Sequence, residues 1–169
     1  IELHEIPPNG QGLAAQIALG ILQHLPDQPL DSAEEVHQLI EAMKIATATA
    51  AARFADPAAM TVSIEELLDD ESLRRAAATI GPRAMALPPA ALPVGHDTVY
   101  LTAADADGMM VSFIQSNFRA FGSGVVIPGT GIAMQNRGSG FVLDPKHANC
   151  VGPNKRPFHT IIPGFVTAD

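Results

Sequence analysis

The sequence predicts an α+β fold, with helices in its first half and antiparallel strands in its second. Up to residue 80, apolar residues recur at helical spacing, and two of these runs follow a Ser-x-x-Glu capping box. From residue 98 onward, short strand-like runs alternate with glycine-rich turns. The chain is 47% apolar and 17% charged, which is typical of a folded domain with a hydrophobic core.

The first two helices are predicted from apolar spacing and from their end signals. Residues 13–24 carry an apolar residue every four positions, and prolines at 26 and 29 end the run. The capping box at 32–35 begins a long helix, which should stop before Pro57 because a residue that precedes proline disfavours the α conformation. The buried stripe of this long helix is expected to contain Val36, Leu39, Ile40, Met43, Ala46 and Ala50.

Two shorter helices and a linker complete the first half. A second capping box, at 63–66, begins the first of them, and residues 70–80 are predicted to form the other before Gly81 and Pro82. A linker rich in alanine and proline then extends to residue 97. The chain is therefore divided into a helical region, 1–97, which ends in this linker, and a strand-and-loop region, 98–169.

The second region begins with a predicted β-hairpin. Residues 98–104 are predicted to form a buried strand, and the Asp-Gly step in the turn at 105–108 is typical of hairpins. Residues 109–116 should therefore form the partner strand. After a glycine-rich loop and a polar loop, residues 160–166 are predicted to form the last strand.

Composition and spacing exclude several classes of function. The formal net charge is −8 with no basic stretch, which argues against a nucleic-acid partner. No apolar run has the roughly 20 residues of a membrane span. The six histidines lack metal-ligand spacing and Cys150 is a lone cysteine, so neither a metal nor another cofactor is expected. Cytoplasm and periplasm both stay open as locations.

Thr98 is the residue that points most directly to chemistry. It lies where the linker meets the first predicted strand, directly after Asp97. If the chain were cut between these two residues, the Thr98 hydroxyl would lie beside its own free amine, which has a reference pKa of about 7.7–8.0 and can accept the hydroxyl proton. The alternative is an ordinary β-branched residue that begins a strand.

Four stretches resemble, in this order, the γ-glutamyltranspeptidase family of N-terminal nucleophile hydrolases. They are Pro-Pro-Asn-Gly-Gln-Gly at 7–12, Ile-Glu-Ala-Met-Lys at 40–44, Gly-Ser-Gly at 122–124 and Gly-Pro-Asn-Lys-Arg-Pro at 152–157. The resemblance implies the αββα sandwich of these hydrolases, present here as a central fragment. Residues 1–97 would end the large subunit and residues 98–169 would begin the small one.

The resemblance also implies a function, that of a zymogen which cuts itself between Asp97 and Thr98. The freed Thr98 would attack γ-glutamyl or related acyl amides, as in glutathione metabolism. Parts of the same protein upstream and downstream would complete the site, so this segment alone should be inactive, and a homo-oligomer would be compatible. The alternatives are an amidase like the cephalosporin and glutaryl acylases, or a non-catalytic binding or structural relative.

The remaining site residues are likewise implied by the resemblance. Ser116 aligns with a threonine whose hydroxyl contacts the nucleophile, and the alternative is an ordinary serine at the end of a strand. Phe118 replaces an asparagine of the family. Arg137 stands at a glutamine position, and Gly140 stands where the family has the acidic residue that holds the glutamyl amine.

The Ser-Ser pair of the family becomes His159 and Thr160. With Arg137, these two residues are the predicted substrate-binding set, and a purely structural role is the alternative for each. The change at Gly140 indicates an altered acyl pocket. Lys155 and Arg156 are interpreted as part of a solvated or carboxylate-paired loop that supports subunit packing, and the alternative is that they bind a substrate anion.

Overall fold

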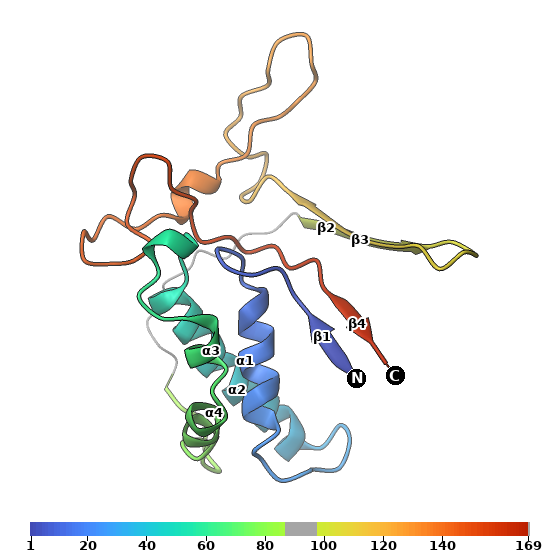
Figure 1. Cartoon of the computed structure of the whole chain (residues 1–169), viewed down its shortest axis with the longest axis vertical. Helices are drawn as coiled ribbons and strands as arrows, with labels where there is room; N and C mark the ends of the chain where they lie inside the picture. Colours follow the sequence, from blue (N-terminus) through green and yellow to red (C-terminus); the bar gives the residue numbers. More distant parts are fainter. Residues whose placement is uncertain (87–97, 169) are drawn as a thin grey trace.

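The structure is a computed structural model that describes residues 1–86 and 98–168 (Figure 1). Its helices gather in one part of the molecule, the antiparallel pair β1–β4 lies beside α1, and the antiparallel hairpin β2–β3 projects away from the helices. The predicted α+β class is therefore confirmed.

The core forms where α1 (Gly12–Leu22) packs against α2 (Ala33–Arg53). The face of α2 in this core carries Ala42, Ala46 and Ala50, each at most 3% exposed. Because residues four apart lie on the same face of a helix, these small side chains let the two helices approach closely.

The predicted buried stripe of α2 is only partly correct. Ala46 and Ala50 are buried, but four larger apolar residues are between 43% and 50% exposed. Helix α1 covers the alanine face, and no described element covers the neighbouring face. The four exposed residues are Val36, Leu39, Ile40 and Met43.

The predicted helix starts are confirmed by their caps. Ser32 Oγ accepts a hydrogen bond from the backbone N–H of Glu35, 3.1 Å away. Ser63 and Glu66 form a complete reciprocal capping box at the start of α3 (Ile64–Leu67). Helix α4 (Asp70–Ala77) ends three residues before the predicted end at residue 80, because the chain there tightens into turns with i→i−3 hydrogen bonds. A short 3₁₀ helix, η1 (Pro57–Ala59), lies between α2 and α3.

The two chain ends meet in the first sheet. Strand β1 (Glu2–His4) pairs antiparallel with β4 (Phe165–Thr167), and Leu3 lies opposite Val166. The predicted last strand, 160–166, is mostly wrong, because β4 contains only Phe165–Thr167. The chain six residues before β4 is held by the entry loop, since the His159 N–H donates to the Asn9 carbonyl at 2.9 Å.

The second sheet is the predicted hairpin. Strand β2 (Thr98–Ala104) pairs antiparallel with β3 (Met110–Ser116) over seven residues. Asp105 Oδ1 accepts hydrogen bonds from the N–H groups of Asp107 and Met109, and Gly108 adopts a φ of +88°. The prediction that β2 is buried is wrong, because no described element covers its apolar face and all seven of its residues are exposed.

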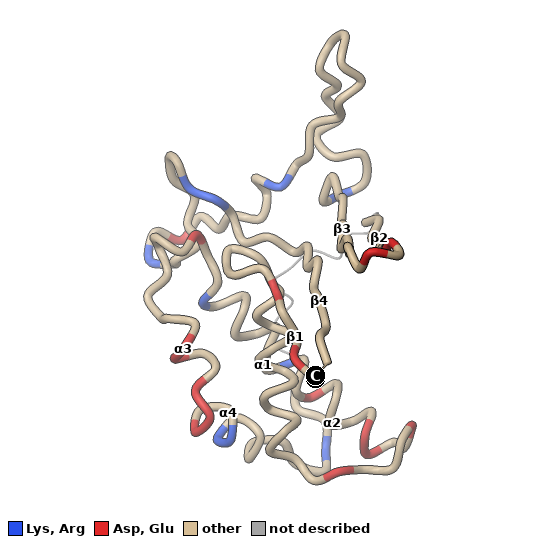
Figure 2. Tube along the Cα trace, turned by 45° about the vertical axis from the view of Figure 1, so that its right-hand side comes forward, with Lys and Arg blue, Asp and Glu red and all other residues tan. Residues whose placement is uncertain are grey.

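Charge is distributed unevenly along the chain (Figure 2). Residues 108–168 contain five Lys and Arg side chains and one acidic residue, Asp144, although the whole chain has a net charge of −8. Apart from Asp144, the acidic residues of the described chain lie before residue 108, on the helices, on and after β1, in the loops between these elements and at the hairpin turn. The loops that follow β3 are therefore electropositive relative to the rest of the chain.

Candidate active site

Thr98 and Ser116 are partners at the open end of the hairpin. Thr98 is the first residue of β2, Ser116 is the last residue of β3, and the register places them directly opposite each other. Opposite residues of an antiparallel pair point to the same face, with Cβ atoms about 4.5–5.5 Å apart. Asp97, the other predicted cleavage residue, lies outside the described residues.

The strand face that carries Thr98 contains several hydroxyl groups beside apolar side chains such as Ile114 and Met110. Since side chains alternate along a strand, Thr98 shares its face with Tyr100 and, across the hairpin, with Ser112 and Ser116. The Tyr100 and Ser112 hydroxyl groups are hydrogen-bonded at 2.9 Å. This face can therefore present hydroxyl groups to a polar substrate.

Ser116 connects this face to the loop that follows β3. Its Oγ accepts a hydrogen bond from the backbone N–H of Phe118 at 2.9 Å. The hydroxyl hydrogen of Ser116 remains free to be donated elsewhere. Ser116 thus fixes the backbone of Phe118 through this hydrogen bond, and its own hydroxyl hydrogen stays available for a group near Thr98.

Phe118 packs against Arg137, which begins the 3₁₀ turn η2 (Arg137–Gly140). The guanidinium carbon lies 4.5 Å from the centroid of the Phe118 ring, and that of Arg119 lies 5.4 Å from it. Arg137 is only 3% exposed, and its Nη1 donates to Thr160 Oγ1 at 2.9 Å. Its Nη2 is buried and has no hydrogen-bond partner among the described residues.

The side chain of Asn136 holds this loop in place. Its Oδ1 accepts from the Arg119 N–H at 3.0 Å, and its Nδ2 donates to the carbonyls of Arg119 and Gly122. Phe118 adopts a φ of +79°, which is unusual for a residue with a large side chain. The Asn136 bonds and the Phe118 N–H bond to Ser116 stabilise this turn.

His159 completes the cluster as a neutral imidazole. Its Nδ1 accepts from the Ile161 N–H at 3.3 Å, so the proton resides on Nε2. Burial and then the positive charge of Arg137 lower its pKa from 6.5 to about 4. His159 therefore offers a neutral N–H donor near pH 7.

The three predicted substrate-binding residues thus lie together. Arg137 contacts Thr160 directly and influences His159 electrostatically, and Phe118 joins this cluster to Ser116. The sequence alone does not indicate that Phe118 supports a guanidinium, because the two residues are 19 positions apart in irregular loops.

The same motifs belong to a known family of proteins. The sequence model of the gamma-glutamyltranspeptidase family matches the entire chain, residues 1–169. This chain belongs to the γ-glutamyltranspeptidase family.

Relatives within the γ-glutamyltranspeptidase family include the glutathione hydrolase-like YwrD proenzyme of Bacillus subtilis (strain 168), which is 42% identical over 97% of this chain and 31% of its own length. The oxamate amidohydrolase proenzyme of Klebsiella pneumoniae is 42% identical over 95% of this chain and 30% of its own length. The chain therefore spans about a third of the length of these relatives.

A solved structure confirms the fold. The crystal structure of cephalosporin acylase from Bacillus halodurans superposes with a TM-score of 0.87 at 52% identity, covering 96% of this chain and 30% of the acylase. The predicted N-terminal nucleophile hydrolase fold, present as a fragment, is thus confirmed.

Arg156 pairs with a carboxylate in this γ-glutamyltranspeptidase-family chain, as the packing interpretation expects, and its role in subunit packing stays a prediction. Its backbone N–H and its Nε donate to Asp56 Oδ2 at 3.0 and 3.3 Å. The backbone N–H of Arg156 is the largest cause of the lowered pKa of Asp56. Arg156 therefore connects the loop after residue 150 to the helical region.

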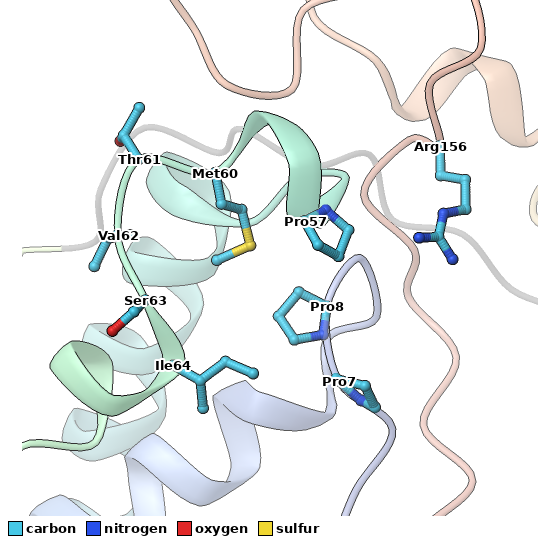
Figure 3. Close-up of a pocket in the computed structure, with 9 residues that line it drawn as sticks. All are labelled: Pro7, Pro8, Pro57, Met60, Thr61, Val62, Ser63, Ile64 and Arg156. Atoms are coloured by element: carbon cyan, nitrogen blue, oxygen red, sulfur yellow. The ribbon is translucent and has the colours of Figure 1, made fainter.

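A pocket of about 590 Å³ lies beside Arg156 (Figure 3). Its wall is mainly apolar and includes Pro8, Met60 and Ile64, and none of its lining residues comes from β2 or β3. It is therefore separate from the Thr98 face.

The described part of the chain contains neither a metal-binding cluster nor a helix suited to a membrane. Within residues 1–86 and 98–168, no group of three or more His, Cys, Asp or Glu residues is placed to hold a metal ion. In the same ranges, none of the helices combines the length and the apolar character that crossing a bilayer requires.

Proposed function

We propose that the full-length protein containing this chain is an autoprocessing amidohydrolase or acyltransferase with Thr98 as its nucleophile. The observation that carries this proposal is the position of Thr98, at the first residue of β2 and directly opposite Ser116. Membership of the γ-glutamyltranspeptidase family supports it, as do relatives that are named proenzymes of hydrolases and acylases.

Maturation would begin at the bond between Asp97 and Thr98. The Thr98 hydroxyl attacks the Asp97 carbonyl, and the C–N bond breaks as an ester forms and the Thr98 nitrogen takes up the proton. Water then hydrolyses the ester, which leaves a carboxylate on Asp97 and a free amine on Thr98.

Turnover would use the same hydroxyl group. The free amine accepts the hydroxyl proton while Oγ1 attacks the amide carbonyl of the substrate. The tetrahedral intermediate collapses to an acyl ester, and the leaving amine departs with the proton. Water or a second amine then attacks the ester, so the products are an acid or a new amide.

The other predicted residues would have distinct roles. Ser116 would donate its hydroxyl hydrogen toward Thr98 Oγ1 and would hold the Phe118 N–H. Arg137, His159 and Thr160 would bind the acyl group. The acyl acceptor and any oligomeric assembly stay predictions, as does the contribution of upstream and downstream parts of the protein.

The proposed cut divides the chain into a large-subunit end, 1–97, and a small-subunit start, 98–169. Several contacts connect the two pieces across this cut. Strand β1 pairs with β4, Asp56 binds Arg156, and the Asn9 side chain donates to the Pro157 carbonyl. We therefore expect the cleaved pieces to remain associated.

A second candidate is an amidase like the acylases, rather than a γ-glutamyl enzyme. The similarity to cephalosporin acylase, at 52% identity, and to oxamate amidohydrolase favours this candidate. Both candidates use the same nucleophile and differ only in the acyl group. The third hypothesis, a non-catalytic relative, predicts neither cleavage nor turnover.

Intact-mass analysis of the full-length protein tests the nucleophile. We expect two pieces for the wild type, with the second beginning at Thr98, and one uncut chain for Thr98→Ala. Thr98→Ser, which keeps a hydroxyl group, should still be cut, more slowly. An uncut wild-type protein, or a cut Thr98→Ala variant, would contradict the proposal.

A further inference from the structure

Arg137 is a buried cation with no acidic partner among the described residues. The ion pairs within residues 1–86 and 98–168 involve other side chains. Burying a charge without an ion-pair partner is unfavourable unless other interactions offset the cost of desolvation. Two contacts offset part of this cost for Arg137, because Phe118 stacks on the guanidinium and Thr160 accepts a hydrogen bond from Nη1.

These contacts leave two polar donors close to Arg137 that are free to bind another group. Because Thr160 Oγ1 accepts from Arg137, its own hydroxyl hydrogen is free to donate to another group. His159 Nδ1 already accepts a hydrogen bond, so Nε2 carries a proton that it can donate. His159 and Thr160 are both partly exposed, whereas Arg137, which contacts Thr160, is buried. Two partly exposed donors beside a buried cation form a surface suited to a carboxylate.

The same surroundings disfavour a second cation. His159 is kept neutral partly by the Arg137 charge. The loops after β3 contain five Lys and Arg residues and a single acidic one, so little negative charge is available to balance an incoming ammonium group (Figure 2). An ammonium bound here would meet the same electrostatic penalty as a protonated imidazole.

We propose that Arg137 determines the acyl specificity of this site. It selects acyl groups that end in a carboxylate and lack an adjacent ammonium, which are the monoamides of dicarboxylic acids, and it rejects γ-glutamyl donors. Arg137 acts through its charge and through the orientation of Thr160, so it is a specificity-determining residue and not a catalytic one. This inference rests on the proposed function.

Three chromogenic anilides, assayed with the full-length, matured protein, test the proposal. Glutaryl p-nitroanilide and γ-glutamyl p-nitroanilide differ only by the α-ammonium, and butyryl p-nitroanilide lacks the carboxylate as well. We expect the wild-type kcat/KM for the glutaryl compound to exceed that for the γ-glutamyl compound by roughly 100-fold, the size of a like-charge penalty in a desolvated site. The glutaryl compound should exceed the butyryl compound by about tenfold or more.

Arg137→Gln removes the charge while it retains donor groups. We expect this variant to lower the glutaryl-to-γ-glutamyl ratio at least about tenfold. Arg119→Gln is the matched control, because Arg119 also lies against the Phe118 ring but does not contact Thr160. It should keep the ratio within about threefold of the wild type.

The possible results separate this inference from the proposed function. Equal wild-type turnover of the glutaryl and γ-glutamyl compounds would overturn the inference, while the proposed nucleophile would stand. An Arg137→Gln variant that matures but keeps the wild-type glutaryl-to-γ-glutamyl ratio would overturn the inference and show that Arg137 has a structural role. If Arg119→Gln lowered this ratio as much as Arg137→Gln, the preference would come from the overall positive charge of these loops and not from Arg137, which would also overturn the inference. If Arg137→Gln fails to mature, Arg137→Lys replaces it and should keep the direction of the preference. Absence of cleavage and of all three activities in the wild type would instead reject the proposed function.

Discussion

The Ser116 hydroxyl oxygen accepts the backbone N–H of Phe118 at 2.9 Å, and Ser116 itself lies directly opposite Thr98. One side chain thus connects the proposed nucleophile to the loop that packs against Arg137. Direct contacts through Ser116 and Phe118 therefore connect the proposed nucleophile, Thr98, with the proposed specificity residue, Arg137. Substitutions at Ser116 and at Arg137 can be assayed separately.

Ser116→Ala should lower kcat of the matured protein about tenfold, the effect of one lost hydrogen bond of about 1.4 kcal/mol in the transition state. Ser116→Thr keeps the hydroxyl group and should retain most of the activity. Initial rates on glutaryl p-nitroanilide measure both effects. A change confined to KM would indicate that Ser116 acts only through the position of Phe118, and unchanged kinetics would exclude the proposed role.

His159 should make the stability of the protein depend on pH between about 4 and 6.5. Its pKa falls from 6.5 to about 4 on folding, so in this range the unfolded chain binds a proton that the folded chain does not. The free energy of unfolding should therefore rise with pH through this range and fall on acidification, by about 2 kcal/mol after allowance for partial exposure.

The matched variant for this prediction is His159→Asn, whose Oδ1 can still accept the Ile161 N–H. Urea unfolding of both proteins at pH 4.5 and 7 gives the comparison, in which the contributions of other titrating groups cancel. The wild type should lose more stability than the variant at the lower pH. Parallel losses in both proteins would contradict the assigned pKa.

Gly122 should tolerate no side chain. Its φ is +72°, and an added Cβ would lie 2.5 Å from the backbone oxygen of Met134. Gly124 has a similar φ of +75° but open space around it. Gly124→Ala should therefore cost about 1 kcal/mol, the penalty of the left-handed conformation. Gly122→Ala should cost about 2–4 kcal/mol, because the clash adds to that penalty.

Denaturant unfolding measures both glycine variants. Because the carbonyl of Gly122 also binds Asn136, Gly122→Ala should in addition weaken turnover of carboxylate-bearing anilides. Equal destabilisation by the two substitutions would show that the close approach of the Met134 carbonyl does not constrain this turn.

The two pieces produced by cleavage should stay together without a covalent bond. Strand β1 lies before the cut and β4 lies after it, and the Asp56–Arg156 contact joins residues 100 positions apart. Native mass spectrometry of the matured protein should detect both pieces in one particle. Arg156→Ala should lower the concentration of urea at which they separate, whereas Lys155→Ala, which changes a neighbouring charge, should not. Separation of the wild-type pieces in buffer would contradict this prediction.

The sequence alone determined the parts of the structure that depend on neighbours along the chain. The N-cap residues Ser32 and Ser63 each accept a hydrogen bond from an N–H group three residues later, and the Asp105 turn acts within four residues. Such bonds form wherever the local pattern occurs, so the helix starts and the hairpin could be predicted. The position of Thr98 opposite Ser116 follows from the turn as well, because a hairpin turn sets the register of its strands.

Only the tertiary structure decided which faces are buried and which distant loops meet. The α2 stripe could not be predicted correctly, because its two apolar faces differ mainly in side-chain size and α1 packs only on the alanine face. Likewise, Arg137 meets Phe118 and Thr160 through irregular loops, in which side-chain direction follows no fixed period. Thr98 was therefore evident in the sequence, whereas the buried cation proposed to select its substrate, Arg137, became evident only from the packing around it.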